Sequence, residues 1–200
     1  ILIKSGIILS KTPLSFFQNN NVQNIARDLL GKIIYTNING HISSAMIIET
    51  EAYQGLEDKA SHAYNNIKTK RTEVMYKAGG CCYVYLCYGI HYLFNIVTNQ
   101  VNIPHAVLIR SGEPHSGIDS IKKRRGNNIQ YPNLLKGPGN FTKGMGIAMN
   151  LNGAQLNSKY IWIEDNFIED YSIESTQRVG IDYAGEDALL PWRYILKNFR

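Results

Sequence analysis

Cysteine is scarce in this sequence, and no apolar run is long enough to cross a membrane. The 200 residues include only Cys81, Cys82 and Cys87, an odd number without a C-x-x-C pair. This count suggests neither a disulfide framework nor a four-ligand zinc site, and it fits a reducing cytoplasm best. The apolar start, ILIKSGIILS, is interrupted by Lys4 and Gly6 and is too short for a membrane span or a signal peptide. We therefore expect a cytoplasmic protein without a membrane segment.

Nucleotide-binding motifs, internal repeats and low-complexity linkers are missing as well. The glycine-rich stretch Gly137–Gly146, GPGNFTKGMG, lacks the Lys-Ser/Thr pair that ends a P-loop and does not match the dinucleotide pattern. No nucleotide cofactor is therefore expected, although backbone amides at a helix start here could still meet a phosphate group.

The composition fits one compact basic domain. With 44% hydrophobic residues, a chain of this length can bury a substantial core, and we expect a single domain over residues 1–200. The formal net charge is +5 and the isoelectric point about 9.0. This excess of positive charge favours an anionic partner, such as nucleic acid or an acidic surface.

Apolar spacing predicts a helix near the N-terminus and a hairpin after it. A helical stripe lies between the capping side chains at 19–21 and Gly31, and its members are Val22, Ile25, Ala26, Leu29 and Leu30. Two strand-like runs, 32–36 and 41–53, are then joined through Asn39-Gly40, a dipeptide typical of tight hairpin turns.

The second of these runs contains an acidic strand, AMIIETEAY, at Ala45–Tyr53. Alternation along a strand places Glu49, Glu51 and Tyr53 on one face together with Ala45 and Ile47. Burying either carboxylate costs several kcal/mol unless a cation or hydrogen-bond donors compensate for it. The pair therefore predicts a wet cleft, or an Arg or His opposite, unless this is an edge strand with its polar face in solvent.

A second hairpin is predicted at Cys82–Thr98, CYVYLCYGIHYLFNIVT, with Tyr88 at or near its tip. A large ring at a hairpin tip either folds back onto its own strands or is held out to enter another molecule. A basic protein that presents an aromatic wedge has the arrangement that unstacks bases while a nucleotide is extruded. The residues alone leave both interpretations open.

Further charged and polar segments surround these strands. A polar, turn-rich segment at Gln54–Lys70 carries His62 and is expected over the mouth of the sheet, and a short apolar strand, 106–110, ends in Arg110, a cation that could pair with a glutamate. The run KKRR at Lys122–Arg125 is more typical of a solvated helix face than of a phosphate contact.

Four blocks in this order and spacing resemble the alkyladenine (3-methyladenine, methylpurine) DNA glycosylases across most of the chain. They are IIETEAYQGLEDKASHAY, YVYLCYGIHYLFNIV, AVLIRSGEP and GPGNFTKGMGI, and the match extends to PWRY near the end. The resemblance implies a mixed α/β (α+β) fold in a single domain, with a curved antiparallel sheet flanked by helices and a protruding β-hairpin that enters the minor groove of DNA.

The same resemblance implies a role for each of seven residues. Glu51 matches the carboxylate that activates the attacking water, Arg110 the cation beside it, and Tyr88 the wedge that fills the gap left by the flipped nucleotide. The remaining four match residues at the extruded base. Tyr53, His62 and Tyr85 match those that bind this base, and Asn95 matches the one that disfavours guanine. His91 and Asn140 depart from the pattern, since another aromatic and a lysine are common there.

The implied reaction needs no metal, cofactor or lysine. An alkylated purine is already a good leaving group, so one carboxylate that deprotonates a water can suffice. The resemblance gives no role to Lys59, the one lysine of the acidic block. We expect a monofunctional glycosylase that binds damaged double-stranded DNA as a monomer, releases alkylated purines of the 3-methyladenine or 7-methylguanine type, and leaves an abasic site for base excision repair.

Two other functions are also considered for this sequence. A non-catalytic DNA-binding module of the same shape would keep Tyr88 and the basic face but tolerate loss of Glu51. A metal-dependent nuclease would use Glu49 and Glu51 as ligands, although no third carboxylate lies on that strand face. Single residues also have structural explanations: His62 as an ordinary loop histidine, and Tyr83 and Tyr92 as core residues. For Glu49, two interpretations remain open, as a partner of a structural arginine or as a support for Glu51.

Overall fold

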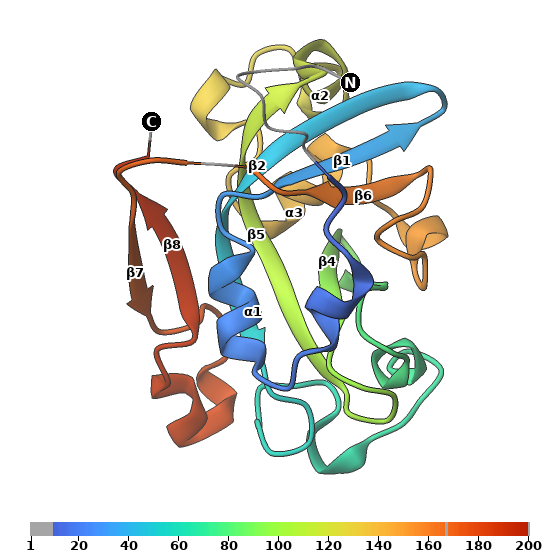
Figure 1. The fold of residues 1–200 in the computed structure, drawn as a ribbon, viewed down its shortest axis with the longest axis vertical. Coiled ribbons are helices and arrows are strands. Elements are labelled where there is room, and N and C mark those ends of the chain that lie inside the picture. Colours follow the sequence, from blue (N-terminus) through green and yellow to red (C-terminus); the bar gives the residue numbers. More distant parts are fainter. Residues whose placement is uncertain (1–9, 167, 200) are drawn as a thin grey trace.

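A computed structural model describes residues 10–166 and 168–199, and the apolar start considered above lies largely outside them. These residues form an α+β domain around an eight-stranded antiparallel sheet (Figure 1). Its strands are β1 (Ile33–Ile38), β2 (His41–Tyr53), β3 (Cys82–Cys87), β4 (His91–Thr98), β5 (His105–Ser116), β6 (Ile161–Glu164), β7 (Ser172–Thr176) and β8 (Arg193–Lys197). The α-helices are α1 (Val22–Asp28), α2 (Ile118–Arg125) and α3 (Pro138–Met145).

Short 3-10 turns complete the fold. They are η1 (Leu14–Gln18), η2 (Tyr64–Asn66), η3 (Glu73–Tyr76), η4 (Tyr131–Asn133), η5 (Met149–Leu151) and η6 (Asp182–Leu189). No helix among the described residues is both long and apolar enough to cross a membrane.

The long strand β2 organises the sheet. One edge of β2 pairs with β5, and the order continues through β4 to β3. The other edge pairs first with β1 and then, at 49–51, with β8. The β1–β2 turn has φ angles of 53° at Asn39 and 82° at Gly40, as a type I′ turn requires, which confirms the first predicted hairpin.

The predicted N-terminal helix is also confirmed. The side chain of Asn21 accepts a hydrogen bond from the backbone N–H of Asn24 and caps α1, which ends at Asp28, two residues before the predicted Leu30. Figure 1 shows α1 in front of β2 and β5, where the hydroxyl of Thr50 donates to the carbonyl of Ala26. A buried row, Ala52, Val107, Ile96 and Cys82, crosses the sheet on this front face.

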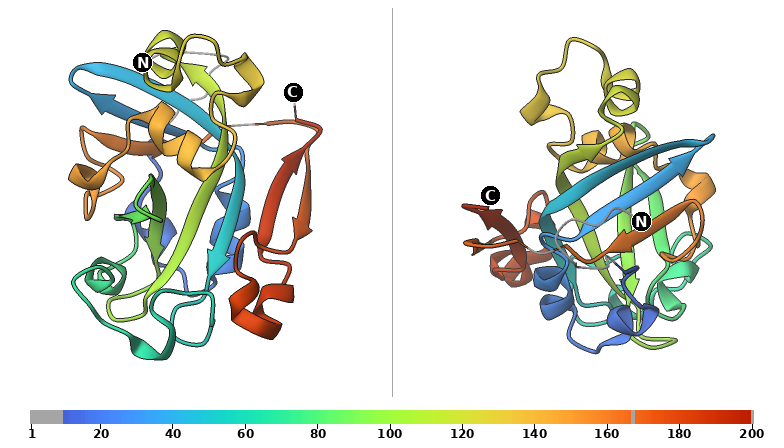
Figure 2. Two further views of the ribbon diagram at one scale, coloured as in Figure 1. Left: turned by 180° about the vertical axis from the view of Figure 1, so that it is seen from behind. Right: turned by 45° about the horizontal axis from the view of Figure 1, so that its top comes forward.

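The back face carries the complementary row. Glu51 is opposite Leu108, Leu108 is opposite Asn95, and Asn95 is opposite Tyr83, on four neighbouring strands. The register shifts on both sides of Glu49 and then returns to its earlier offset, so the alternation predicted for β2 is preserved. Seen from behind, α3 lies over one end of this face (Figure 2, left) and leaves the end where β2 finishes to the loops.

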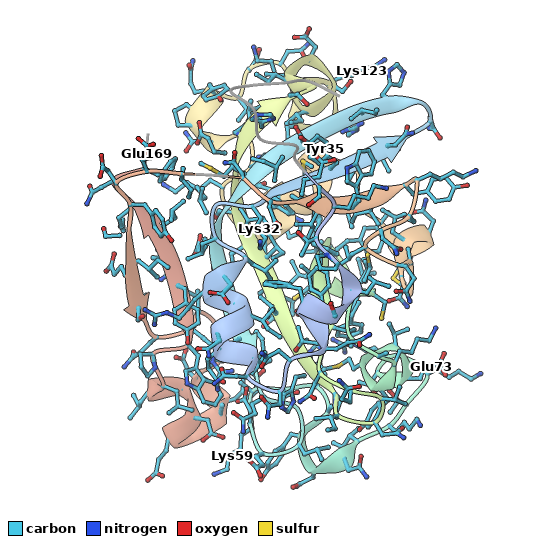
Figure 3. The ribbon with its side chains drawn as sticks, in the orientation of Figure 1. Lys32, Tyr35, Lys59, Glu73, Lys123 and Glu169 are labelled. Carbon is cyan, nitrogen blue, oxygen red and sulfur yellow. The ribbon has the colours of Figure 1, made fainter. Side chains whose placement is uncertain are left out.

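The basic run on α2 differs from its prediction, because two of its four cations bind within the protein. Arg124 donates to the hydroxyl of Ser43 and to the carbonyl of Gly144, while Arg125 donates to the carbonyl of Leu134. Lys123 extends outward at the far end of the molecule (Figure 3). Half of the run therefore anchors α2 to the fold instead of forming a solvated face.

Candidate active site

A cavity of about 460 Å³ opens on the back face of the sheet. Its floor comes from β2, β5, β4 and β3, through the side chains of Tyr53, Arg110, Leu108, Asn95, Tyr83 and Tyr85. Its walls include the loop with His62 and Arg71, the tip of the β3–β4 hairpin, the C-terminal segment 179–183 and the start of α3 at Pro138. Residues distant in sequence thus converge on one hollow.

Glu51 lies behind this cavity, fully buried, and both its oxygens are hydrogen-bonded. Oε1 accepts from the backbone N–H of Val179 at 2.8 Å and lies 3.1 Å from a terminal nitrogen of Arg110. Oε2 accepts from the hydroxyl of Tyr53 at 2.7 Å. Tyr53, Arg110 and Val179 all line the cavity, so each residue that binds the carboxylate also borders the hollow.

Arg110 lies between the two carboxylates of β2. Its Nε donates to Oε1 of Glu49 at 2.9 Å, while a terminal nitrogen meets Glu51. Burial opposes the charge on Arg110, but the carboxylates of Glu51 and Glu49 outweigh it and raise its pKa. The guanidinium therefore occupies the space between the carboxylates that a metal ion would need.

Glu49 is the more heavily bonded carboxylate. Besides Arg110, it accepts from Nε of Arg193 at 2.7 Å and from the hydroxyl of Ser111 at 2.6 Å. Burial alone would raise its pKa, but the hydrogen bond from Ser111 and the two arginines lower it overall. Glu49 thus pairs with arginines and, through Arg110, also supports Glu51, so the two interpretations left open by the sequence both apply.

Tyr53 is held in the protonated form that can donate to Glu51. Burial, followed by the negative charge of Glu51, raises the pKa of Tyr53 well above 10.0. The guanidinium carbon of Arg178 lies 4.8 Å from the centre of its ring and fixes the ring from the other side. The hydroxyl of Tyr53 is therefore a donor to Oε2 at any physiological pH.

His62 belongs to an aromatic cluster on the opposite wall. Arg71 can only donate, so its 3.1 Å contact assigns Nε2 of His62 as an acceptor and leaves Nδ1–H to donate to the hydroxyl of Tyr83 at 2.9 Å. Burial, followed by the charge of Arg71, lowers the pKa of His62 to about 4. The His62 ring packs edge-on against Tyr85 at 4.6 Å, and Arg71 lies over the Tyr85 ring.

Asn95 is buried in the cavity floor, where its amide nitrogen donates to the carbonyl of Tyr83 at 3.3 Å. This bond orients the side chain, because only the amide nitrogen can donate. Asn95 thus presents a fixed amide to whatever enters the cavity.

Tyr88 is the outermost ring of the site. Its side chain is 90% exposed, its φ is 50°, and it stands at the tip of the β3–β4 hairpin beside the cavity mouth. Leu86 and Ile90 flank it, with exposures of 47% and 73%. The tip is therefore an apolar projection that does not fold back onto its own strands.

The structure brings all seven predicted site residues to one cavity, six as lining residues and Glu51 behind them. Sequence reasoning predicts Tyr83 in the core, and the structure confirms this, because Tyr83 is 2% exposed within a buried cluster. It missed that Tyr83 also lines the cavity, although Tyr83 shares a strand face with Tyr85. It also missed Arg71 and Val179. No sequence pattern could have indicated Val179, because it acts through its backbone N–H.

Within residues 10–166 and 168–199, no group of three or more His, Cys, Asp or Glu side chains is arranged to hold a metal ion. The donor set around Glu51 consists of an amide, a guanidinium and a phenol, all of which stabilise a carboxylate directly.

Known proteins are similar in sequence to this chain over nearly its whole length. A protein of Chlamydia felis named provisionally as a 3-methyladenine DNA glycosylase is 46% identical over 185 residues, which cover 92% of this chain and 95% of the relative. Proteins named in the same way from Natranaerobius thermophilus and Desulfitobacterium hafniense are 43% and 41% identical, over 94% and 91% of this chain and 96% and 93% of the relatives. The family model for methylpurine-DNA glycosylase matches residues 15–200. The chain therefore belongs to the methylpurine-DNA glycosylase family.

Proposed function

We propose that this protein is a monofunctional DNA glycosylase that extrudes alkylated purines, of the 3-methyladenine and 7-methylguanine type, from duplex DNA and hydrolyses their N-glycosidic bond. The observation that carries the proposal is a buried carboxylate, Glu51, whose bonding partners Tyr53, Arg110 and Val179 all line a cavity that also contains Tyr83 and Tyr85. The exposed Tyr88 beside the cavity mouth supports entry from the minor groove, as a wedge between base pairs.

The two oxygens of Glu51 suit two different tasks. Oε1 is fixed by Val179 and Arg110, whereas Oε2 is bonded to the hydroxyl of Tyr53. A small displacement of that hydroxyl frees Oε2 on the cavity side. A water there can pass its proton to Oε2 while its oxygen attacks the anomeric carbon of the sugar. The glycosidic electrons leave with the purine, whose positive charge they neutralise.

The residues of the cavity wall would also select alkylated purines over normal ones. Tyr53 and Tyr85 present ring faces on which an electron-poor, cationic purine stacks better than a normal one, by roughly 1–2 kcal/mol for each good contact. Arg71 already lies 4.7 Å from the centre of the Tyr85 ring, and its side chain is exposed, so a base that stacks on this face displaces it. The fixed amide of Asn95 lies in the cavity floor, where it would disfavour the exocyclic amino group of guanine.

The absence of a lysine from the cavity supports hydrolysis without strand cleavage. A glycosylase that also cleaves the strand uses an amine that forms a Schiff base with the sugar. Among the described residues, none of the side chains that line the cavity is a lysine. Lys59 is exposed at the lower end of the molecule (Figure 3).

The test is to incubate the protein with alkylated duplex DNA in EDTA and to separate free bases from DNA. We expect free methylated purines and intact strands with alkali-labile abasic sites, and no adduct with protein after borohydride reduction. A requirement for added magnesium with strand breaks would favour a nuclease. Lesion binding without any base release would favour a non-catalytic DNA-binding module.

A further inference from the structure

A second hollow, of about 410 Å³, lies on the other flank of the hairpin tip. The hairpin contributes Ile90, His91 and Tyr92 to it, and α2, α3 and the segment 146–148 after α3 contribute the rest. The start of α3 borders both hollows, through Pro138 on the cavity side and Gly139 on this side. The projection that carries Tyr88 thus stands between the candidate active site and a second concave surface.

The hairpin is firmly attached at this flank. The hydroxyl of Thr142 on α3 donates to the carbonyl of Tyr92 at 2.6 Å. A Cβ at Gly139 would lie 2.9 Å from the His91 ring, so only glycine lets α3 approach the hairpin this closely. The second hollow therefore keeps a fixed position relative to Tyr88.

The charge of this hollow is positive. Arg124 and Lys143 line it together with His91, and none of the described residues that line it is a carboxylate. Arg124 is held at the hollow by bonds from one terminal nitrogen to Ser43 and Gly144. Lys143 is exposed on α3, and within the described residues no carboxylate lies within ion-pair distance of it.

We infer that this hollow is a binding site for a DNA backbone phosphate next to the base step that Tyr88 opens, and that Lys143 makes the contact. The inference rests on the proposed function for the presence of DNA. Asn140, one turn earlier on α3, carries no charge, and its amide already donates to the carbonyl of Lys136 at 2.8 Å. The pair of Lys143 and Arg124 offers the positive charge that a phosphodiester needs.

The test measures binding of undamaged duplex DNA against salt concentration for the wild type, Lys143→Ala and the control Lys197→Ala. Both substitutions remove one positive charge, but Lys197 is on β8 and pairs with Glu174 at 3.0 Å, at the opposite side of the sheet from the hairpin. We expect the slope of log K against log salt to fall in magnitude by about 0.9 for Lys143→Ala and to stay unchanged for the control.

An unchanged slope for Lys143→Ala, or an equal decrease for Lys197→Ala, would overturn the inference. Binding of undamaged DNA needs no excision. A wild type that binds this DNA but releases no base would therefore refute the proposed function, while the salt dependence measured for Lys143→Ala would still test the phosphate site.

Discussion

At the residue scale, His62 is held as a neutral imidazole in the cavity wall. Its pKa is lowered from 6.5 to about 4 by burial and then by Arg71, whereas an unfolded chain titrates it near 6.5. Between these values the unfolded state binds more protons, so the contribution of His62 to stability falls as the pH is lowered from about 6.5 to about 4.

The substitution His62→Gln removes the titration of the His62 imidazole and leaves all other titrating groups in place. We expect the wild type to lose stability relative to His62→Gln as the pH falls through that window, because only the wild type must keep a buried imidazole unprotonated. Urea unfolding of both proteins across the window measures the difference. Other groups, such as His105, cancel in this comparison, and a difference that does not vary with pH would contradict the assignment.

Single residues also show where sequence reasoning succeeds and where it stops. Alternation placed Glu49, Glu51 and Tyr53 on one face, and the need of a buried acid for a cation led to Arg110. The contact of Val179 with Glu51 is made by a backbone N–H. Every residue except proline carries that group, so its use leaves no trace in the sequence.

At the scale of elements, the β3–β4 hairpin presents an aromatic ring that contributes little to the core. Tyr88 is 90% exposed, so Tyr88→Ser should leave the fold and thermal unfolding unchanged. We expect it to weaken binding of lesion-containing duplex by about 1–3 kcal/mol, the usual value of a base stack on an aromatic ring. Titration with a lesion duplex and with its undamaged counterpart measures this loss.

Tyr160→Ser provides the matched control, since Tyr160 is also an exposed tyrosine but lies just before β6. Equal losses for the two variants would show that Tyr88 has no special role in DNA binding.

The hairpins could be predicted because their turns are local, as with Asn39-Gly40. The position of segment 178–183 could not, because tertiary contacts alone bring it across the sheet to Glu51.

At the scale of the whole molecule, a buried ion pair joins three segments around the site. Arg178 binds both oxygens of Asp58, and it also donates to the carbonyls of Ala52 on β2 and Asp187 on η6. Its guanidinium lies between the rings of Tyr53 and Trp192. This single side chain therefore connects the end of β2, the loop after it and the C-terminal segment.

Arg178→Met should destabilise the protein by about 3–5 kcal/mol, because it leaves the fully buried Asp58 without its cation. Lys197→Ala breaks an ion pair whose side chains are about half exposed, and it should cost at most about 1 kcal/mol. Urea unfolding curves of both variants give the two values. Similar small losses would mean that Asp58 and Arg178 do not hold the three segments together.

The most direct measurement is the single-turnover rate of base release by Glu51→Gln at saturating protein, with binding to the same lesion duplex measured in parallel. Glutamine keeps the shape of the side chain, and the hydroxyl of Tyr53 can accept a hydrogen bond from it where it now donates. If Glu51 deprotonates the attacking water, binding persists while the rate falls by about 10²–10⁴-fold. Base release at the wild-type rate would contradict the account.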